Sequence, residues 1–498
     1  MATASYALHR EEVVPANRVV PLNCVDKALL ALDSRNERMV FHIMLGVQGE
    51  IDPIRLNQAV SFVMSIHPTM RSLLRAKWFR HFREVQEDFD GKIVTVWDVD
   101  SFEASRRPGE ARSDATPERL LFQWINRPID PTKDLPVRVL LLKRKVGDYS
   151  IVFTFHHHAA DGIRCLRVIR EVIDKYNGEP AIDPLPTEDA CNLHKRNEVV
   201  ELVKSSRSKT GHLPRQVPSN LFRRFAVASL PPPARIFHDG AGPPSGEVGY
   251  LHRVLDAVEL KQIDSKARAS GATLNDLLLA SCFRVVEKWN QQHGIRCKKI
   301  SIMVPVDVGR RASRQVVSNQ VSYISPATSP QDRADPAALL RKTSTARIRL
   351  LRDGGAVSII YFTYFLSFLP LPALRGIGRL LLRTRLFVDS ILVTNVGPIW
   401  LTPRSSAGRQ TSIGDATIHE VTGVTPVVTP FRMGIYAGIY NEALNIALTY
   451  RTSLVSEEKA QAFLDLYIED IRKYPPGQHS DAMALKPSDS IREIVQAQ

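Results

Sequence analysis

Apolar and polar positions in the first part of the chain predict a strand followed by a helix. Residues 39–47 form an apolar run of strand length. Residues 54–66 then carry apolar side chains at helical intervals after an Asp52-Pro53 start, the pattern of a helix with one buried face. This succession indicates an α/β unit.

The apolar pattern continues with a pair of strands and a second helix. Residues 135–142 and 149–155 are apolar runs joined by a turn that contains Gly147-Asp148. Apolar residues at helical spacing follow between Ile163 and Tyr176. Because turn-joined strands occur together with intervening helices, we expect an α/β fold with mixed sheets rather than purely parallel ones.

Periodicity is lost in the middle of the chain and then returns. Three consecutive prolines at 231–233 lie in the irregular part. Beyond it, the pattern predicts a helix at about 274–290, a hairpin around Asn441-Glu442 and a closing helix at 456–473. A chain of 498 residues is long enough for two cores. We therefore expect an N-terminal lobe over residues 16–190, an irregular crossover over 191–249, a C-terminal lobe over 250–475 and a loose tail over 476–498.

Residues 359–374 form the most apolar stretch of the chain. The stretch contains Pro370 and Pro372 and is shorter than the roughly 20 residues that a membrane-spanning helix needs, so we expect no transmembrane helix. Three interpretations are open: a buried helix, which we favour, the lining of an acyl tunnel, or a segment that rests on a membrane surface. In the third, four arginines would face lipid phosphate groups: Arg375, Arg379, Arg383 and Arg385.

The chain carries a formal charge of +14, which predicts attraction to an anionic partner. Nucleic acid, a phosphorylated cofactor, an acidic carrier protein and a lipid surface all meet that condition. The sequence has no zinc finger, KH loop or RNP-type aromatic strand, so we expect no nucleic-acid partner. Its five scattered cysteines show neither a disulfide framework nor CxxC spacing, and residues 1–15 lack the apolar core of a secretory signal. We therefore expect a cytoplasmic protein with reduced thiols and no metal.

Three histidines follow the apolar run at 149–155, in the segment His156-His157-His158-Ala159-Ala160-Asp161-Gly162. Acyl transfer from a thioester needs a base that removes the acceptor's proton, and neutral histidine suits that task. We expect Asp161 to cap the next helix or to bind a charged partner, and Gly162 to permit a turn that a side chain would obstruct. A structural polar loop and an adventitious metal site are the alternatives.

Adjacent side chains on an extended segment point to opposite faces. His156 and His158 should therefore share one side of the strand end, and His157 should face the other. A single metal centre is then hard to build from the three.

The histidine segment resembles the HHxxxDG motif of the condensation-domain superfamily, also called the chloramphenicol acetyltransferase-like acyltransferases. The resemblance covers almost the whole chain, since residues 21–26 look like the family's opening segment and residues 66–71 look like its HPxLR helix end. It implies two similar α/β lobes arranged in a V, with the motif at their junction and a tunnel that the two substrates enter from opposite faces. It also implies that His157 is the general base and that His156, Asp161 and Gly162 support it.

Three further segments resemble the wax ester synthase and alcohol acyltransferase branch. Asn275 and Asp276 lie in a segment similar to its NDxxLA helix, residues 303–307 resemble its VPVxxR strand, and Asn395 lies in a segment similar to its SNxGP turn. Asn275 and Asp276 are equally well explained as helix-capping residues, and Asn395 as part of a turn before Pro398. A DFGWG motif, usual in peptide synthetase condensation domains, is absent, which favours a free-standing ester- or amide-forming enzyme.

The resemblance thus implies an acyltransferase, in natural-product or lipid biosynthesis, that uses coenzyme A or a phosphopantetheinyl acyl carrier as donor and a hydroxyl or amine as acceptor. It implies no permanently bound cofactor, and we expect a monomer. A backbone N–H, protonated His157 or an Asn amide would each serve as the oxyanion donor. Two alternatives remain: a wax ester or glycolipid acyltransferase at the membrane surface, and a non-catalytic binding module with the same fold.

Overall fold

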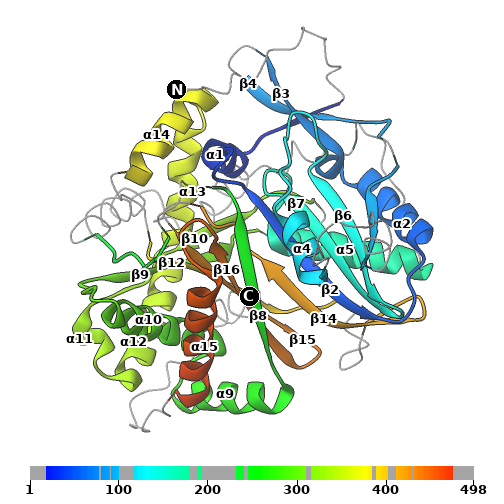
Figure 1. Ribbon diagram of the computed structural model, residues 1–498. Helices are drawn as coiled ribbons and strands as arrows, with labels where there is room; N and C mark the ends of the chain where they lie inside the picture. The colour runs from blue at the N-terminus through cyan, green and yellow to red at the C-terminus, as the bar shows by residue number, and fades with distance from the viewer. Residues whose placement is uncertain are drawn as a thin grey trace, which may run out of the picture.

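The computed structural model shows two lobes side by side, each a mixed β-sheet with helices packed against it (Figure 1). This confirms the predicted α/β fold with mixed sheets. The structure describes residues 18–77, 80–89, 91–99, 116–179, 189, 191, 232–240, 245–309, 316–383, 389–401, 411–428 and 431–474. The expected tail at 476–498, and most of the expected crossover at 191–249, lie outside these residues.

The N-terminal lobe is built on a six-stranded sheet. Its elements are β2 (Val40–Gln48), α2 (Pro53–Ile66), β5 (Val94–Asp98), α4 (Pro117–Ile125), β6 (Val137–Lys145), β7 (Asp148–His156), α5 (Gly162–Asn177), β13 (Ser412–Ile413) and β14 (Ala416–Val424). The strand order is β13-β14-β2-β7-β6-β5, in which only β5 and β6 are parallel. Alternate strand residues bury opposite faces, one against α2 and α5 and the other against α4.

The C-terminal lobe is built on a seven-stranded sheet. Its elements are β8 (Val248–Leu255), α9 (Ala257–Ala269), α10 (Leu274–Gln292), β9 (Ile300–Asp307), β10 (Val321–Ile324), β11 (Ala327–Thr328), α11 (Pro330–Arg333), α12 (Pro336–Arg352), α13 (Gly355–Leu366), α14 (Leu371–Arg383), β12 (Ile391–Pro398), β15 (Met433–Tyr440), β16 (Ala443–Arg451) and α15 (Glu457–Lys473). The strand order is β10-β9-β12-β15-β16-β8, with β11 also on β9. Helices α10, α12 and α15 pack together over its core.

The hairpin between β15 and β16 forms where the sequence predicts it. Asn441 and Glu442 both have positive φ, 49° and 59°. A two-residue turn with two left-handed residues matches the twist of the strands on either side, which explains the tight connection.

A small third sheet and a short helix come from the beginning of the chain. Strands β1 (Val19–Pro21), β4 (Arg80–Val85) and β3 (Ser72–Lys77) form the sheet, and the 3-10 helix η2 (Pro68–Arg71) precedes β3. Helix α1 (Cys24–Leu32) packs against α13 and α14 of the C-terminal lobe. The N-terminal segment therefore contacts both lobes.

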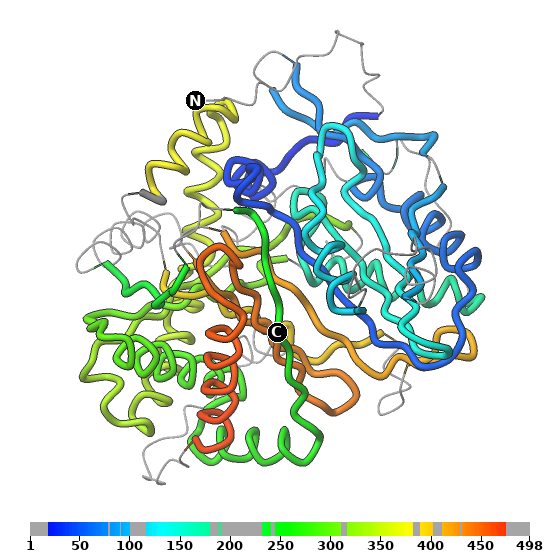
Figure 2. Tube along the Cα trace, in the orientation of Figure 1, coloured from blue at the N-terminus to red at the C-terminus, as the bar shows by residue number. Residues whose placement is uncertain are grey.

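Strand β14 crosses between the lobes, which the sequence pattern did not predict. It lies in the range expected for the C-terminal lobe, yet it pairs with β2, with Val421 opposite Leu45. Figure 2 shows this orange segment running beside the blue strand of the other lobe. The boundaries at 190 and 250 stay predictions, but β13 and β14 belong to the N-terminal sheet.

The apolar stretch at 359–374 is not the single buried helix that we favoured. It is divided between α13 and α14, because the proline at position 370 interrupts the helix. One side of both helices faces the interior, while Phe365, Phe368 and Leu380 are exposed. Within the described ranges, the structure has no helix with the length and apolar character needed to cross a membrane.

Candidate active site

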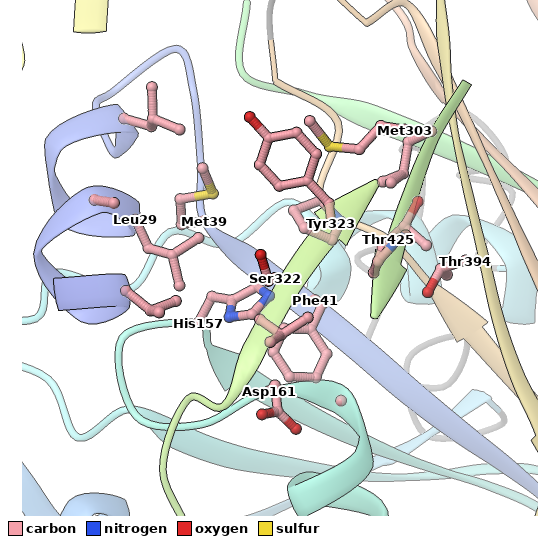
Figure 3. A pocket seen from close by; sticks show the side chains of 18 of the residues that line it. Leu29, Met39, Phe41, His157, Asp161, Met303, Ser322, Tyr323, Thr394 and Thr425 are labelled. Carbon is pink, nitrogen blue, oxygen red and sulfur yellow. The ribbon is translucent and has the colours of Figure 1, made fainter. Parts of the chain in front are cut away.

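His157 lies in a cavity between segments of both lobes (Figure 3). The cavity has a volume of about 420 Å³ and is lined mainly by aliphatic and aromatic side chains. Leu29 and Met39 lie on one side of His157, whereas Tyr323, Met303 and Thr394 approach from the C-terminal lobe. His157 therefore faces an apolar space large enough for a substrate.

The end of β7 fixes the position of His157. The β7 ladder with β2 runs to His156, and the backbone N–H of His157 then donates to the carbonyl of Met39 at 2.7 Å. The His157 ring packs edge-on against Phe41, with ring centroids 5.0 Å apart. The backbone turns directly afterwards, because the N–H of Ala159 bonds back to the carbonyl of His156 at 3.0 Å.

His156 and His158 share the opposite side, as the alternation predicted. Their Nδ1 atoms are 2.8 Å apart, and the N–H of His158 also donates to Nδ1 of His156 at 3.2 Å. Burial holds the pKa of His158 well below its ordinary value, so this ring is neutral and can donate its Nδ1 proton to His156. Nε2 of His156 is 3.5 Å from the carboxylate of Asp33. The pair therefore braces the loop and lies apart from the cavity.

Asn319, from the C-terminal half, fixes the tautomer of His157. Its Nδ2 donates to Oδ1 of Asp26 at 2.8 Å and to the carbonyl of His157 at 2.6 Å. The other amide atom, Oδ1 of Asn319, lies 3.1 Å from Nδ1 of His157, within hydrogen-bond distance. Since an amide oxygen only accepts, Nδ1 carries the proton and Nε2 carries the lone pair. Burial lowers the pKa of His157, so the ring is neutral at neutral pH.

Asn319 is hydrogen-bonded to a residue of a buried ion pair, Asp26. Asp26 and Arg83 are fully buried, with 2.6 Å between Oδ2 and Nη2. Arg83 also donates to the carbonyl of His158 and, at 3.1 Å, to that of Pro21. Burial raises the pKa of Asp26, while the Arg83 charge and the Asn319 hydrogen bond act against that shift. The network joins α1, β4 and the C-terminal lobe to the histidine loop.

Asp161 has both of the roles expected for it. It caps α5 by accepting from the N–H of Arg164 at 3.1 Å, and its Oδ2 accepts from the N–H of Gln320 at 2.8 Å. The Arg164 guanidinium lies 3.4 Å from Asp161 and 2.7 Å from Asp307 on β9. Asp161 thus connects the motif to the C-terminal lobe.

The expected reason for Gly162 is wrong. Its φ is not positive, and a Cβ added there would meet nothing within 4 Å. Gly162 is among the residues that line the cavity of His157, and the space around it is open. The backbone here therefore needs no glycine for a special turn.

Asn275 and Asn395 meet at a second cavity. Nδ2 of Asn395 donates to Oδ1 of Asn275 at 3.2 Å, and Oδ1 of Asn395 accepts from the N–H of Gly397 at 2.8 Å. This cavity is about 700 Å³ and more polar, and it shares Pro305 and Asn395 with the cavity of His157. The two spaces therefore adjoin at Asn395.

Asp276 does not line either cavity. Its carboxylate accepts from the N–H of Thr273 as part of a capping box, and it pairs with Arg347 at 2.6 Å, both side chains being buried. The helix-capping interpretation therefore accounts for this residue.

Sequence reasoning missed Asn319, Arg83 and the role of Asp26. Asp26 lies in the opening segment that resembles the family, but nothing in the sequence indicates its pairing with Arg83. Asn319 is 162 positions from His157 and carries no motif of its own. Within the described residues, no three histidine, cysteine or acidic side chains gather in a way that could hold a metal ion.

Comparisons with curated proteins give partial sequence matches. No family model matches the chain. Rv2305 of Mycobacterium tuberculosis is 27% identical over 272 residues, 52% of this chain and 59% of that protein. A linear gramicidin synthase of Brevibacillus parabrevis is 26% identical over 132 residues, 26% of this chain and 2% of that protein. The chain thus matches only part of the length of either relative.

Solved structures of similar fold cover nearly the whole chain. The first condensation domain of the calcium-dependent antibiotic synthetase has a TM-score of 0.66 and 13% identity, over 94% of this chain and 99% of that one. The starter condensation domain of rhizomide synthetase RzmA, in complex with C8-CoA, has a TM-score of 0.62 and 14% identity, over 93% and 97%. SgcC5 from Streptomyces globisporus has a TM-score of 0.58 and 18% identity, over 92% and 100%.

These structural likenesses confirm the predicted resemblance to the condensation-domain superfamily at the level of the fold. The closer likeness to wax ester synthases and alcohol acyltransferases stays a prediction. The chain has the two-lobed fold of the condensation domains.

Proposed function

We propose that this protein is an acyltransferase that moves an acyl group from a thioester to a hydroxyl or amine, with His157 as the general base. The observation that carries the proposal is the hydrogen bond to Asn319, which leaves the Nε2 lone pair of His157 at an apolar cavity. A neutral, oriented imidazole beside a substrate-sized space is the arrangement that general-base catalysis requires.

The reaction moves one proton from the acceptor to His157 and then from His157 to the leaving thiolate. Nε2 of His157 takes the proton of the acceptor as its oxygen or nitrogen forms a bond to the thioester carbonyl carbon. The tetrahedral intermediate collapses by breaking the C–S bond, and the leaving thiolate takes the proton from His157. The lowered pKa keeps His157 unprotonated before each turnover.

The first turn of α5 can stabilise the oxyanion. Gly162 and Ile163 line the cavity, and their N–H groups belong to the helix start, where backbone donors lack intrahelical partners. The N–H of Arg164 is already bound by Asp161. We assign the oxyanion to the N–H groups of Gly162 and Ile163, with the positive end of the helix dipole behind them.

The two adjoining cavities suit two chemically different parts of the substrates. The cavity of His157 is about 420 Å³ and apolar, a volume within the roughly 300–1,000 Å³ of small-molecule sites. We assign a medium or long alkyl chain to it. The second cavity has both signs of charge in its lining, with Lys261 and Arg268 beside Asp264 and Glu442, and we assign it to a polar arm such as the pantetheine part of the donor.

One of the two donor types has support from a similar structure. The RzmA domain binds C8-CoA, which favours an acyl-CoA donor. The condensation domain of the antibiotic synthetase is in complex with a substrate analogue, and a carrier-bound thioester is the second donor that we consider. Natural-product or lipid biosynthesis is the corresponding role for this protein.

The test is to incubate the protein with octanoyl-CoA and with octanoyl-loaded carrier protein in the presence of alcohol and amine acceptors. Mass spectrometry of the products, together with release of free thiol, identifies the donor and the acceptor. We expect an ester or amide product with one donor class. Thiol release that never exceeds spontaneous hydrolysis, for every donor and acceptor, would refute the proposal.

A further inference from the structure

Helices α13 and α14 expose an apolar surface that a water-facing helix pair ordinarily avoids. Phe365 is 65% exposed and Phe368 is 71% exposed, and the ring of Tyr364 contacts both, with centroids 6.0 and 5.1 Å away. Leu369 in the connecting turn is also exposed. We call Tyr364, Phe365, Phe368 and Leu369 the aromatic tip. Isolated exposed apolar residues are common, but a contiguous group of this kind marks an interaction site.

Basic residues accompany the aromatic tip on α14 and α1. Residues 355–383 contain three arginines and no aspartate or glutamate. Nζ of Lys27 on α1 bonds to the carbonyl of Ser367 at 2.8 Å, which places an ammonium at the turn. Burial and then the charges of Arg375 and Lys27 lower the pKa of His81, which places these two cationic groups near that ring.

The outward face of α14 continues the same character. Its exposed positions include Pro372, Ala373, Gly376 and Leu380, with Arg379 as the charged residue among them. The opposite face, including Leu374, Ile377 and Leu381, lines the cavity of His157. Figure 1 shows α14 at the periphery of the molecule, beside α1. One helix thus separates an exposed, basic and apolar surface from the apolar cavity.

We propose that the aromatic tip and the outer face of α14 dock on an anionic lipid surface. Aromatic and aliphatic side chains enter the boundary between headgroups and acyl chains, while neighbouring basic groups are attracted to lipid phosphates. An acidic protein would satisfy the charge but has no need for three exposed apolar side chains beside Tyr364 at the same place. Docking in this orientation brings lipid chains to the wall of the apolar cavity.

The experiment is sedimentation of the full-length protein with vesicles of phosphatidylcholine alone and of phosphatidylcholine mixed with phosphatidylglycerol. We expect binding to the mixed vesicles, weak binding to the neutral ones, and release by added salt, because surface charges are screened over about 10 Å at 0.1 M salt. Phe365→Ser with Phe368→Ser should weaken binding by about tenfold or more, since two deeply inserting side chains are lost. Arg379→Glu should weaken binding to the mixed vesicles alone.

Matched controls lie on other surfaces of the protein. Val146, 78% exposed in the turn between β6 and β7, and Arg119 on α4 allow Val146→Ser and Arg119→Glu, which should leave vesicle binding unchanged. Absence of wild-type binding to the mixed vesicles, or equal binding by the double phenylalanine variant, would overturn the proposal. A concentration-dependent dimer abolished by the same variant would assign the tip to a second copy of this chain instead. Turnover of a short, soluble thioester tests the catalytic proposal separately and should not change in the double variant.

Discussion

Asn319→Ala tests whether Asn319 orients His157 for catalysis or only stabilises the fold. The variant removes the acceptor for Nδ1 of His157 and two donated hydrogen bonds, one of them to the buried carboxylate of Asp26. A hydrogen bond to a charged group contributes about 1.5–3 kcal/mol, so the variant should lose about 2–4 kcal/mol of unfolding free energy in all. Without the fixed tautomer and ring orientation, kcat should fall about 10- to 100-fold with little change in KM.

Asn290→Ala provides the matched control. Asn290 is also fully buried, and its side chain makes three hydrogen bonds, to Phe237, Arg235 and Cys297, within the C-terminal lobe. Urea denaturation should show comparable losses of stability in the two variants, whereas steady-state thioester turnover should show a large kcat loss only for Asn319→Ala. A wild-type kcat in Asn319→Ala, or equal kcat losses in both, would refute the role assigned to Asn319.

Three further variants or conditions test other parts of the site. Burial lowers the pKa of His42 to about 3 and that of His158 well below its ordinary value, so the unfolded chain takes up protons that the native chain does not. Stability should therefore fall as the pH drops below about 6.5, by about 2 kcal/mol per such histidine at pH 5, and thermal melts that do not change between pH 7.5 and 5 would contradict this. Gly162→Val should fold normally but reduce kcat/KM for long acyl donors more than for short ones, and an unchanged ratio would remove Gly162 from the cavity wall. Asp276→Ala leaves Arg347 buried without its partner and should cost about 3–5 kcal/mol in urea denaturation, which an unchanged midpoint would exclude.

The strands and helices of both lobes could be predicted because their apolar residues recur at the spacing that each structure buries. The strand pair before the histidines, the helix after them and the hairpin at Asn441 all follow from local pattern and turn chemistry. The alternation of side chains along an extended segment also predicted that His156 and His158 would lie together, away from His157. These are short-range properties of the chain.

The choice of partners between distant segments could not be predicted in the same way. Nothing in the local sequence of residues 416–424 says which sheet their strand joins, and it joins that of the other lobe. Asn319 and Arg83 reach the site only through tertiary packing, and a single asparagine or arginine in a sequence does not reveal its contacts. In contrast, the division of the apolar stretch had a local signal, since Pro370 disfavours a continuous helix.

The expectation for Gly162 failed for a different reason. Glycine was assumed to serve the backbone, but its dihedral angles are ones that any residue adopts, and what matters is the empty volume around it. Such a volume is created by the surrounding helices and strands. It is therefore invisible in the local sequence.

The central claim is that His157 removes the acceptor's proton during acyl transfer. The most direct test measures single-turnover transfer from a thioester donor by the wild type, by His157→Ala and by a control, His252→Ala, whose partly exposed ring pairs with Glu420 far from the motif in the sequence. Loss of a positioned general base should slow transfer by about 10²- to 10⁴-fold in His157→Ala, while this variant unfolds like the wild type. His252→Ala should keep full transfer activity. Transfer by His157→Ala at a rate within a few-fold of the wild type would contradict the account.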